Sequence, residues 1–221
     1  MNYLGHLYLS GDQKDLMLAN LFGDFVKGRD YSYLPQIVQT GVTLHREIDH
    51  FIDNHPLILE ILNSFLYKDL PKVASIAIDL YMDHLLAKNW SKYHPMDLES
   101  YEKDFFKFAL NPSNQRFILD DTVYSYPAEF LGLIEIMSKK SWISQYKKID
   151  GLKMASTGLS KRISFDNNLN EAVSIFQKRE RHIENVFFKF MDDARIKFLN
   201  WLSKLFIVYL EIYLSFEIYS I

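Results

Sequence analysis

Residues that interrupt regular secondary structure are scarce in this chain. Its 221 residues include eight glycines and six prolines, which is about half the share that these two residues have in average proteins. Between these few breakers, apolar side chains recur every three or four residues, as they do on one face of a helix. With 48% apolar residues, the chain can bury a sizeable core. We therefore expect an all-α protein, folded as a single-domain helical bundle over residues 1–221.

The composition excludes several kinds of protein. Cysteine is absent, so disulfides, thiolate catalysis, iron–sulfur clusters and cysteine-bound zinc are excluded, and a metal site must use His, Asp or Glu. The formal net charge of −3 offers no overall basic field for nucleic acid. The longest uncharged run of the apolar C-terminal stretch, 205–210, is far shorter than the ~20 residues of a membrane span. Because the N-terminus also lacks the pattern of a signal peptide, we expect a cytoplasmic protein without a membrane span.

Proline, glycine and asparagine mark where helices begin and end. The predicted helices span 15–27, 34–53, 56–66, 71–90, 95–110, 127–137 and 141–154. We expect 117–127 to be a connector rather than a hairpin, and 156–168, rich in Ser, Gly and Asn, to be a loop. The region 170–216 is expected to form two long helices that divide near 191–193. For the apolar tail 199–221, a packing helix, an oligomer contact and an added C-terminal helix remain open.

The helix predicted over 34–53 carries polar groups inside its apolar stripe. At 100° per residue, His45 falls within the stripe and Asp49, four residues later, lies at its edge. For one such case, a core histidine paired with a neighbouring carboxylate is the commoner explanation. A metal-ligating pair is the alternative.

The helix predicted over 71–90 is apolar nearly all round, yet it contains Asp79 and Asp83 one turn apart. Burying either carboxylate costs several kcal/mol unless a cation or hydrogen bonds compensate. A divalent metal ion is one explanation, and hydrogen bonding to Arg46 or a capping role is the other.

The first helix repeats this arrangement, because Asn20 and Asp24 lie one turn apart among apolar residues, and His6 also has apolar neighbours. Three segments thus bring carboxylate, amide or imidazole groups into apolar surroundings. One case carries little weight, but three suggest a shared site.

Four segments of the sequence resemble the acyl carrier protein phosphodiesterases. They are 1–9 (MNYLGHLYL), 20–28 (NLFGDFVKG), 41–56 (GVTLHREIDHFIDNHP) and 79–90 (DLYMDHLLAKNW). The resemblance covers roughly residues 1–195, with weaker similarity at 151–155 and at Arg162. It implies an all-helical, HD-domain-like fold and a divalent ion, usually manganese, with magnesium or iron(II) as alternatives. It also implies removal of the 4′-phosphopantetheine arm from holo acyl carrier protein in fatty acid biosynthesis.

Two features depart from that pattern. No His-Asp dipeptide occurs, and Asp83 and His84 stand in the reverse order, so the ligands cannot be transferred from ordinary HD enzymes. The apolar tail from about Leu199 onward extends past the usual end of the family.

With the resemblance in view, we expect Asp24, His45, Asp79 and Asp83 to ligate the metal, and Asp49 to orient His45 or to serve as an extra ligand. A general acid for the leaving serine oxygen is expected at His6 or His84. The phosphate is expected to be held by Arg46 or Lys27.

Acyl carrier proteins are acidic, so docking should use basic residues near the site. The candidates are Lys27 and Arg29, together with Lys153, Lys161 and Arg162. For the second group, a solvated surface is the commoner explanation.

Other functions remain open at this point. A similar metal cluster could hydrolyse nucleotides or another small phosphodiester, and the polar residues of a non-catalytic interaction module could merely specify packing. A ferritin-like di-iron bundle needs two inward Glu-x-x-His pairs. The chain has one pair, Glu47 to His50, facing outward, which excludes that class. The sequence leaves the oligomeric state and the natural carrier protein open.

Overall fold

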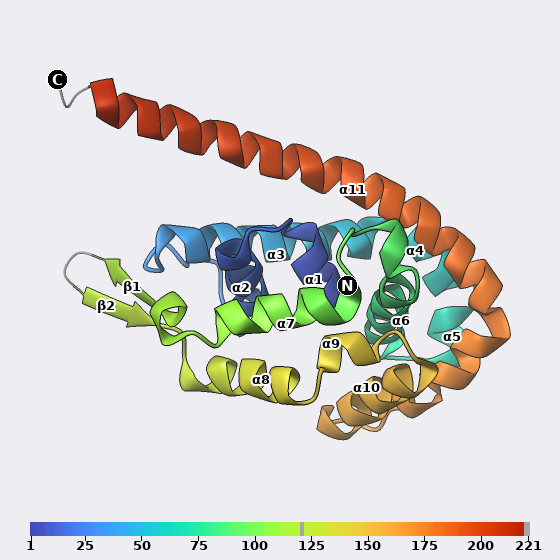
Figure 1. The fold of residues 1–221 in the computed structure, drawn as a ribbon. Coiled ribbons are helices and arrows are strands. Elements are labelled where there is room, and N and C mark those ends of the chain that lie inside the picture. Colours follow the sequence, from blue (N-terminus) through green and yellow to red (C-terminus); the bar gives the residue numbers. More distant parts are fainter. Residues whose placement is uncertain (120–121, 219–221) are drawn as a thin grey trace.

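The computed structural model of the chain describes residues 1–119 and 122–218, and it is a mainly helical bundle (Figure 1). The first half contains α1 (Tyr3–Leu9), α2 (Lys14–Phe22), the 3₁₀ turn η1 (Gly23–Phe25), α3 (Gln36–Asn54), α4 (Pro56–Ile61), the π turn η2 (Leu62–Leu66), α5 (Tyr67–Asp69), α6 (Ala74–Lys88) and the 3₁₀ turn η3 (Trp90–Lys92). The all-α prediction is therefore confirmed for this half.

The second half adds further helices and one small sheet. Its elements are α7 (Leu98–Ala109), η4 (Pro112–Gln115), β1 (Arg116–Leu119), β2 (Thr122–Ser125), α8 (Ala128–Lys139), α9 (Trp142–Gln145), α10 (Ile149–Arg162), η5 (Leu169–Glu171) and α11 (Ala172–Ile218). The short helix α1 lies at the centre, where it contacts α2, α3, α6 and α11. Residues near the N-terminus are therefore surrounded by elements from distant parts of the chain.

The close packing of α2 on α3 depends on a glycine. A Cβ at Gly41 would lie 2.3 Å from the Cβ of Ala19, so only glycine lets the two backbones approach this closely. The apolar stripe of α3, including Val38, Ile48 and Ile52, is buried against this contact and the rest of the core. Polar side chains of α2 and α3 can therefore contact one another directly.

The connector predicted over 117–127 is wrong, because β1 and β2 pair as an antiparallel hairpin. Residues 120–121 lie outside the described part of the chain. Ile118 pairs with Val123, although their exposed fractions are 83% and 63%. The aromatic rings of Phe117 and Tyr124 meet on the other face of the hairpin at 5.9 Å. β-branched and aromatic residues favour a strand even where burial is slight.

The loop predicted over 156–168 is wrong in its first part, because α10 continues to Arg162. Leu152, Ala155 and Leu159 form an apolar face that continues past the predicted end. Packing of that face outweighs the weak helix propensity of serine and glycine.

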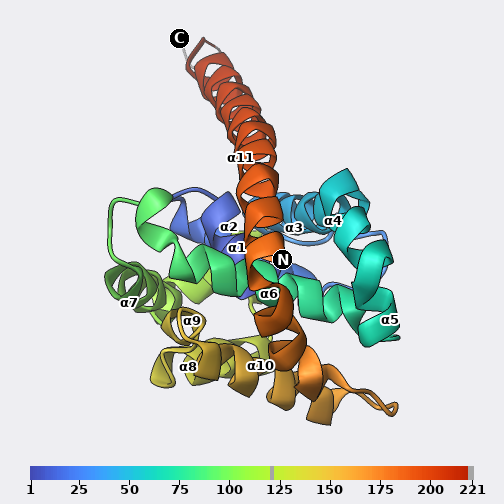
Figure 2. The ribbon, with the colours of Figure 1, turned by 90° about the vertical axis from the view of Figure 1, so that its right-hand side faces the viewer.

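The predicted break near 191–193 is also wrong, since α11 runs through it as one helix. Asp192 and Asp193 lie on its exposed side, while Phe190, Ala194 and Phe198 keep the buried stripe continuous. The apolar tail from residue 199 is the continuation of α11, up to residues 219–221, which lie outside the described part. In two perpendicular views, α11 passes beside α6 and its C-terminal part extends away from the body (Figures 1 and 2). Within residues 1–119 and 122–218, no helix is long and apolar enough to cross a membrane.

Candidate metal centre

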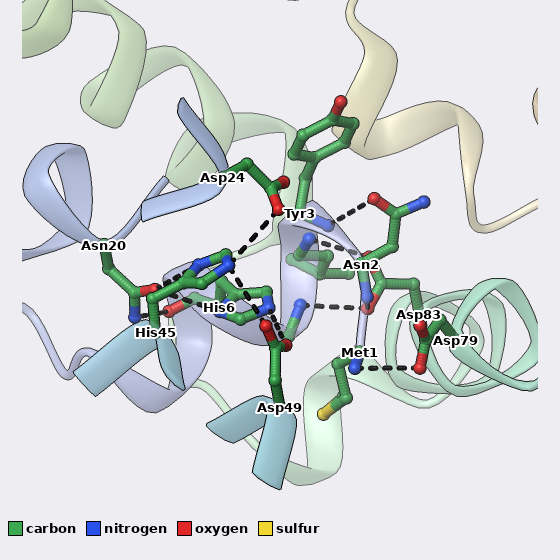
Figure 3. A network of polar contacts seen from close by, with 12 residues as sticks. Met1, Asn2, Tyr3, His6, Asn20, Asp24, His45, Asp49, Asp79 and Asp83 are labelled. Atoms are coloured by element: carbon green, nitrogen blue, oxygen red, sulfur yellow. Dashed lines mark hydrogen bonds and ion pairs between the residues drawn. The ribbon is translucent and has the colours of Figure 1, made fainter. Parts of the chain in front are cut away.

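Three side chains from two distant segments converge beside α1 (Figure 3). Nε2 of His6 lies 3.2 Å from Oδ1 of Asp49, and Nε2 of His45 lies 3.2 Å from Oδ2 of the same carboxylate. The two imidazole rings are stacked with their centroids 4.2 Å apart. One ligand atom from each of the three residues lies within 4.8 Å of the others. This spacing allows one cation to contact all three side chains.

Asn20 of α2 sets the orientation of both rings. Its Nδ2 donates to the carbonyl oxygen of His6 and to Oγ of Ser10, so its Oδ1 must face the rings and accept. Nδ1 of His6 and Nδ1 of His45 lie 2.9 and 3.2 Å from this oxygen. Both imidazoles therefore donate from Nδ1, which leaves Nε2 on the side of Asp49.

This tautomer leaves His6 in an arrangement that suits a cation. In neutral His6, Nε2 carries a lone pair and no proton when Nδ1 is the donor. The lone pair then faces a carboxylate oxygen of Asp49, which is also an acceptor. A divalent cation would relieve this opposition, and metal-ligating histidines usually donate their other ring nitrogen to an oxygen. The donor set of two imidazoles and a carboxylate fits such an ion.

Asp24 joins the cluster from η1. Its Oδ1 lies 3.3 Å from Nε2 of His45, and its side chain is 63% exposed. The turn approaches His45 closely, because a Cβ at Gly23 would lie 2.3 Å from the imidazole Cγ. Arg46 fixes the segment that follows, since its guanidinium donates to the carbonyl oxygens of Val26 and Gly28 at 3.2 and 2.7 Å. The structure thus places Arg46 behind Asp24, as a support for the loop.

The electrostatics of the cluster follow from these contacts. Burial lowers the pKa of His45, but hydrogen bonds to Asp24 and Asp49 outweigh it and raise the pKa to about 9. Burial also lowers the pKa of His6, and the hydrogen bond to Asp49 offsets this only in part. Burial would raise the pKa of Asp49, but the two imidazoles hold that pKa well below its usual range. The carboxylate therefore stays ionised beside both rings.

Asp83 performs a different task in the structure. It is fully buried in α6, and its carboxylate accepts hydrogen bonds of 2.8–3.2 Å from the backbone N–H groups of Asn2, Leu4 and Gly5. Burial raises the pKa of Asp83 to about 7, against the opposing effect of these N–H groups. Asp83 therefore caps the first turn of α1, the helix that carries His6.

Asp79, one turn before Asp83, lines a cleft together with Asp49, and Met1 lies between the two carboxylates in Figure 3. Its Oδ1 forms an ion pair of 3.0 Å with the amine of Met1. The two carboxylates predicted as ligands on α6 thus both hold the N-terminal segment. The cluster of Asp24, His45 and Asp49 is brought together with His6 instead.

The remaining predicted residues are spread more widely. Nδ1 of the buried His84 lies 2.7 Å from the carbonyl oxygen of Tyr146, and the ring meets Phe176 edge-on, outside the lining of the cleft. Nζ of Lys27 donates to the carbonyl oxygen of Asp24 at 2.8 Å. Arg29 is exposed on the loop after η1. The exposed Lys153, Lys161 and Arg162 lie on α10.

The cluster opens into a cleft of about 450 Å³, a size within the range of small-molecule sites. Tyr3 of α1 and Leu159 of α10 line it together with the cluster. Burial raises the pKa of the Tyr3 hydroxyl, and the charge of Arg162 only partly opposes this. Tyr3 therefore keeps its proton at neutral pH, and its hydroxyl points away from the cluster of His6, His45 and Asp49 (Figure 3).

Two residues of this site were missed as functional residues by sequence reasoning. Asn20 was noted only for its spacing from Asp24, although an amide at a fully buried position signals a hydrogen-bonding duty. Tyr3 carried no signal beyond its place in the N-terminal segment.

Comparisons with known proteins point to one family. The family model described as acyl carrier protein phosphodiesterase matches residues 1–194. An acyl carrier protein phosphodiesterase of Enterobacter sp. (strain 638) is 30% identical over 162 residues, which cover 73% of this chain and 79% of that protein. One from Photorhabdus laumondii is 28% identical over 182 residues, which cover 82% of this chain and 85% of that protein. No solved structure gave a significant match.

Proposed function

Because the chain belongs to the acyl carrier protein phosphodiesterase family, we propose that it removes 4′-phosphopantetheine from holo acyl carrier protein. The bond that breaks is the phosphodiester to a serine oxygen of the carrier protein. Water adds to phosphorus, and the serine oxygen leaves with a proton, which yields the apo protein and free phosphopantetheine. The observation that carries the proposal is the convergence of His6, His45 and Asp49 at the cleft.

The reaction depends on a divalent metal ion in this proposal. His6, His45 and Asp49 would hold it, and Asp24 would be a fourth ligand. Mixed imidazole and carboxylate ligation suits manganese, with magnesium or iron(II) as alternatives. A bound ion of this kind acidifies water and stabilises negative charge on phosphoryl oxygens. We assign Asp79 and Asp83 to the support of α1, because their oxygens already bind the amine and backbone N–H groups there.

Other residues of the chain position the metal ligands and the substrate. Asn20 holds both imidazoles so that Nε2 faces the cleft, and Arg46 holds the loop that carries Asp24. Tyr3, which lines the cleft, is placed to contact the substrate there. In this proposal His6 is a ligand rather than the general acid, and His84, which does not line the cleft, takes no part in the chemistry.

The acidic carrier protein is the proposed partner, and the exposed Lys27, Arg29 and Arg162 are proposed to contact it. Acting on this substrate would place the protein in lipid metabolism. We also propose that the protein is cytoplasmic.

The test is incubation with holo acyl carrier protein and Mn²⁺, followed by mass spectrometry of the carrier protein. We expect loss of the arm with the wild type and with His50→Asn, and no loss with His45→Asn. His50 is the matched control, because it lies on the exposed side of the same helix. Retention of the arm with Mn²⁺, Mg²⁺ and Fe²⁺, or hydrolysis of a nucleotide panel in its place, would contradict the proposal.

A further inference from the structure

The segment 140–162, which contains α9 and α10, has a charge balance unlike that of the whole chain. It contains six basic residues and one acidic residue, Asp150, whereas the chain as a whole has a net charge of −3. Within the described residues, none of the six basic side chains forms an ion pair. The basic residues are Lys140, Lys147, Lys148, Lys153, Lys161 and Arg162, and all are exposed.

An apolar groove of about 180 Å³ lies within this basic surface. Trp142 forms one wall, and Met154 of α10, with 67% of its surface exposed, forms another. Gly158, one turn after Met154, leaves the groove open, because a Cβ there would meet no atom within 4 Å. Lys161 follows on the same face of the helix, and Lys140 lines the groove from the end of α8. An exposed apolar groove with a cationic rim is typical of a site for an amphipathic acidic segment.

This groove adjoins the metal cleft. The ring of Trp142 meets the ring of Tyr3 edge-on at 6.0 Å, and Tyr3 lines the cleft. Leu159, next to Gly158 in α10, lines the cleft as well. A protein bound at the groove would therefore have its nearest surface next to the entrance of the cleft.

We propose that this face, the groove of Trp142, Met154 and Gly158 with its rim of Lys140 and Lys161, is the docking site for an acidic, amphipathic segment of the carrier protein. An apolar side chain of that segment fills the groove, and its carboxylates face the two lysines. The arm of the bound carrier protein then reaches the cleft past Tyr3 and Trp142. This inference rests on the proposed function, because it assigns the surface that the protein substrate uses.

Two changes test the site separately. Lys140→Glu with Lys161→Glu reverses the charge of the rim, and Gly158→Leu places an apolar side chain in the groove at a position where a Cβ meets no atom within 4 Å. Each is expected to raise KM for holo carrier protein about tenfold. The control is Lys103→Glu with Lys107→Glu on α7, which makes the same change in net charge on exposed residues elsewhere. Hydrolysis of bis(4-nitrophenyl) phosphate and bound manganese, measured on every variant, report the metal centre independently of docking.

The inference is overturned if the control raises KM as much as the rim variant does, or if Gly158→Leu leaves KM unchanged. Binding of fluorescently labelled apo carrier protein, measured by anisotropy on the same variants, separates the two proposals. Weaker binding by the rim and groove variants alone supports the docking site even if the wild type leaves the arm in place, a result that would contradict only the proposed function. Equal binding by all variants contradicts the docking site.

Discussion

Oδ1 of Asn20 lies 2.9 Å from Nδ1 of His6, and this contact sets which nitrogen of His6 faces the cleft. The same oxygen serves the second imidazole of the cluster. Asn20 thus joins α1, α2 and α3 at the point where the metal site is assembled.

Asn20→Ala should weaken metal binding while the fold persists. The change frees both imidazoles to rotate and to exchange tautomers, and loss of such an orienting partner typically costs 10–100-fold in affinity. Isothermal titration with Mn²⁺ measures the effect. Asn63→Ala, which removes an exposed amide on η2, serves as the control. If Asn20→Ala binds Mn²⁺ with the affinity of the wild type, the orienting role is refuted.

Metal should stabilise the folded protein through Asp49. At a free Mn²⁺ concentration about 100 times the dissociation constant, binding to the folded state alone adds about 2.7 kcal/mol to the free energy of unfolding. We expect EDTA to abolish this increment, and Asp49→Asn to lack most of it. Asp53→Asn, one turn later on α3 and exposed, should keep it. Thermal unfolding with and without Mn²⁺ gives the comparison, and an equal response of the two variants would count against ligation by Asp49.

Asp83→Ala should destabilise the fold severely, because two buried backbone N–H groups and one part-buried N–H group lose their acceptor. Each unsatisfied buried donor costs about 1–3 kcal/mol, so we expect a loss of at least about 2 kcal/mol in urea unfolding. Asp83→Asn keeps an acceptor oxygen and should lose less. If Asp83 caps α1, the asparagine variant will retain bound manganese. A folded asparagine variant without metal would instead restore the sequence-based assignment of Asp83 as a ligand.

His84 should make the protein less stable in mild acid. Burial lowers the pKa of His84 below its ordinary value of 6.5, so below pH 6.5 the unfolded chain binds a proton that the folded protein resists. The free energy of unfolding is therefore highest above pH 6.5. It decreases as the pH falls through that value, by at most about 1.4 kcal/mol per pH unit.

His84→Asn removes this titration and keeps a donor for the carbonyl oxygen of Tyr146. Urea unfolding between pH 5 and 8 should show a shallower pH dependence than in the wild type or in His50→Asn. The His84→Asn variant should turn over holo carrier protein as fast as the wild type, because His84 does not line the cleft. A large loss of turnover in this folded variant would restore the general-acid role.

Local patterns predicted much of the fold. The helix of α3 was expected within two residues of its observed ends, because its apolar stripe and the proline after it are signals carried by neighbouring residues. The same reasoning failed for α10 and α11. Gly158 of α10 and Asp192 and Asp193 of α11 lie on exposed faces, and packing of Leu159 or Phe190 on the core decides that each helix continues.

The candidate site could likewise be predicted only in part. His45 and Asp49 were expected together, because a spacing of four residues on one helix brings them together in any fold that keeps the helix. The partnership of His6 with them was not predictable, since it depends on the place where α1 meets α3. Asp79 and Asp83 looked equally suited to a metal by their spacing, whereas in the structure Oδ1 of Asp79 pairs with the amine of Met1 and both oxygens of Asp83 accept backbone N–H groups.

The amino-acid sequence alone thus determined the helical class, the family resemblance and the pairing of groups that share one helix, because these depend on short-range periodicity and on runs of neighbouring residues. Only the tertiary structure decided which acids remain available for a cation and which serve the backbone. A carboxylate binds the donors that lie nearest to it in space, and for Asp83 these are the N–H groups of α1, some 80 positions away in the chain.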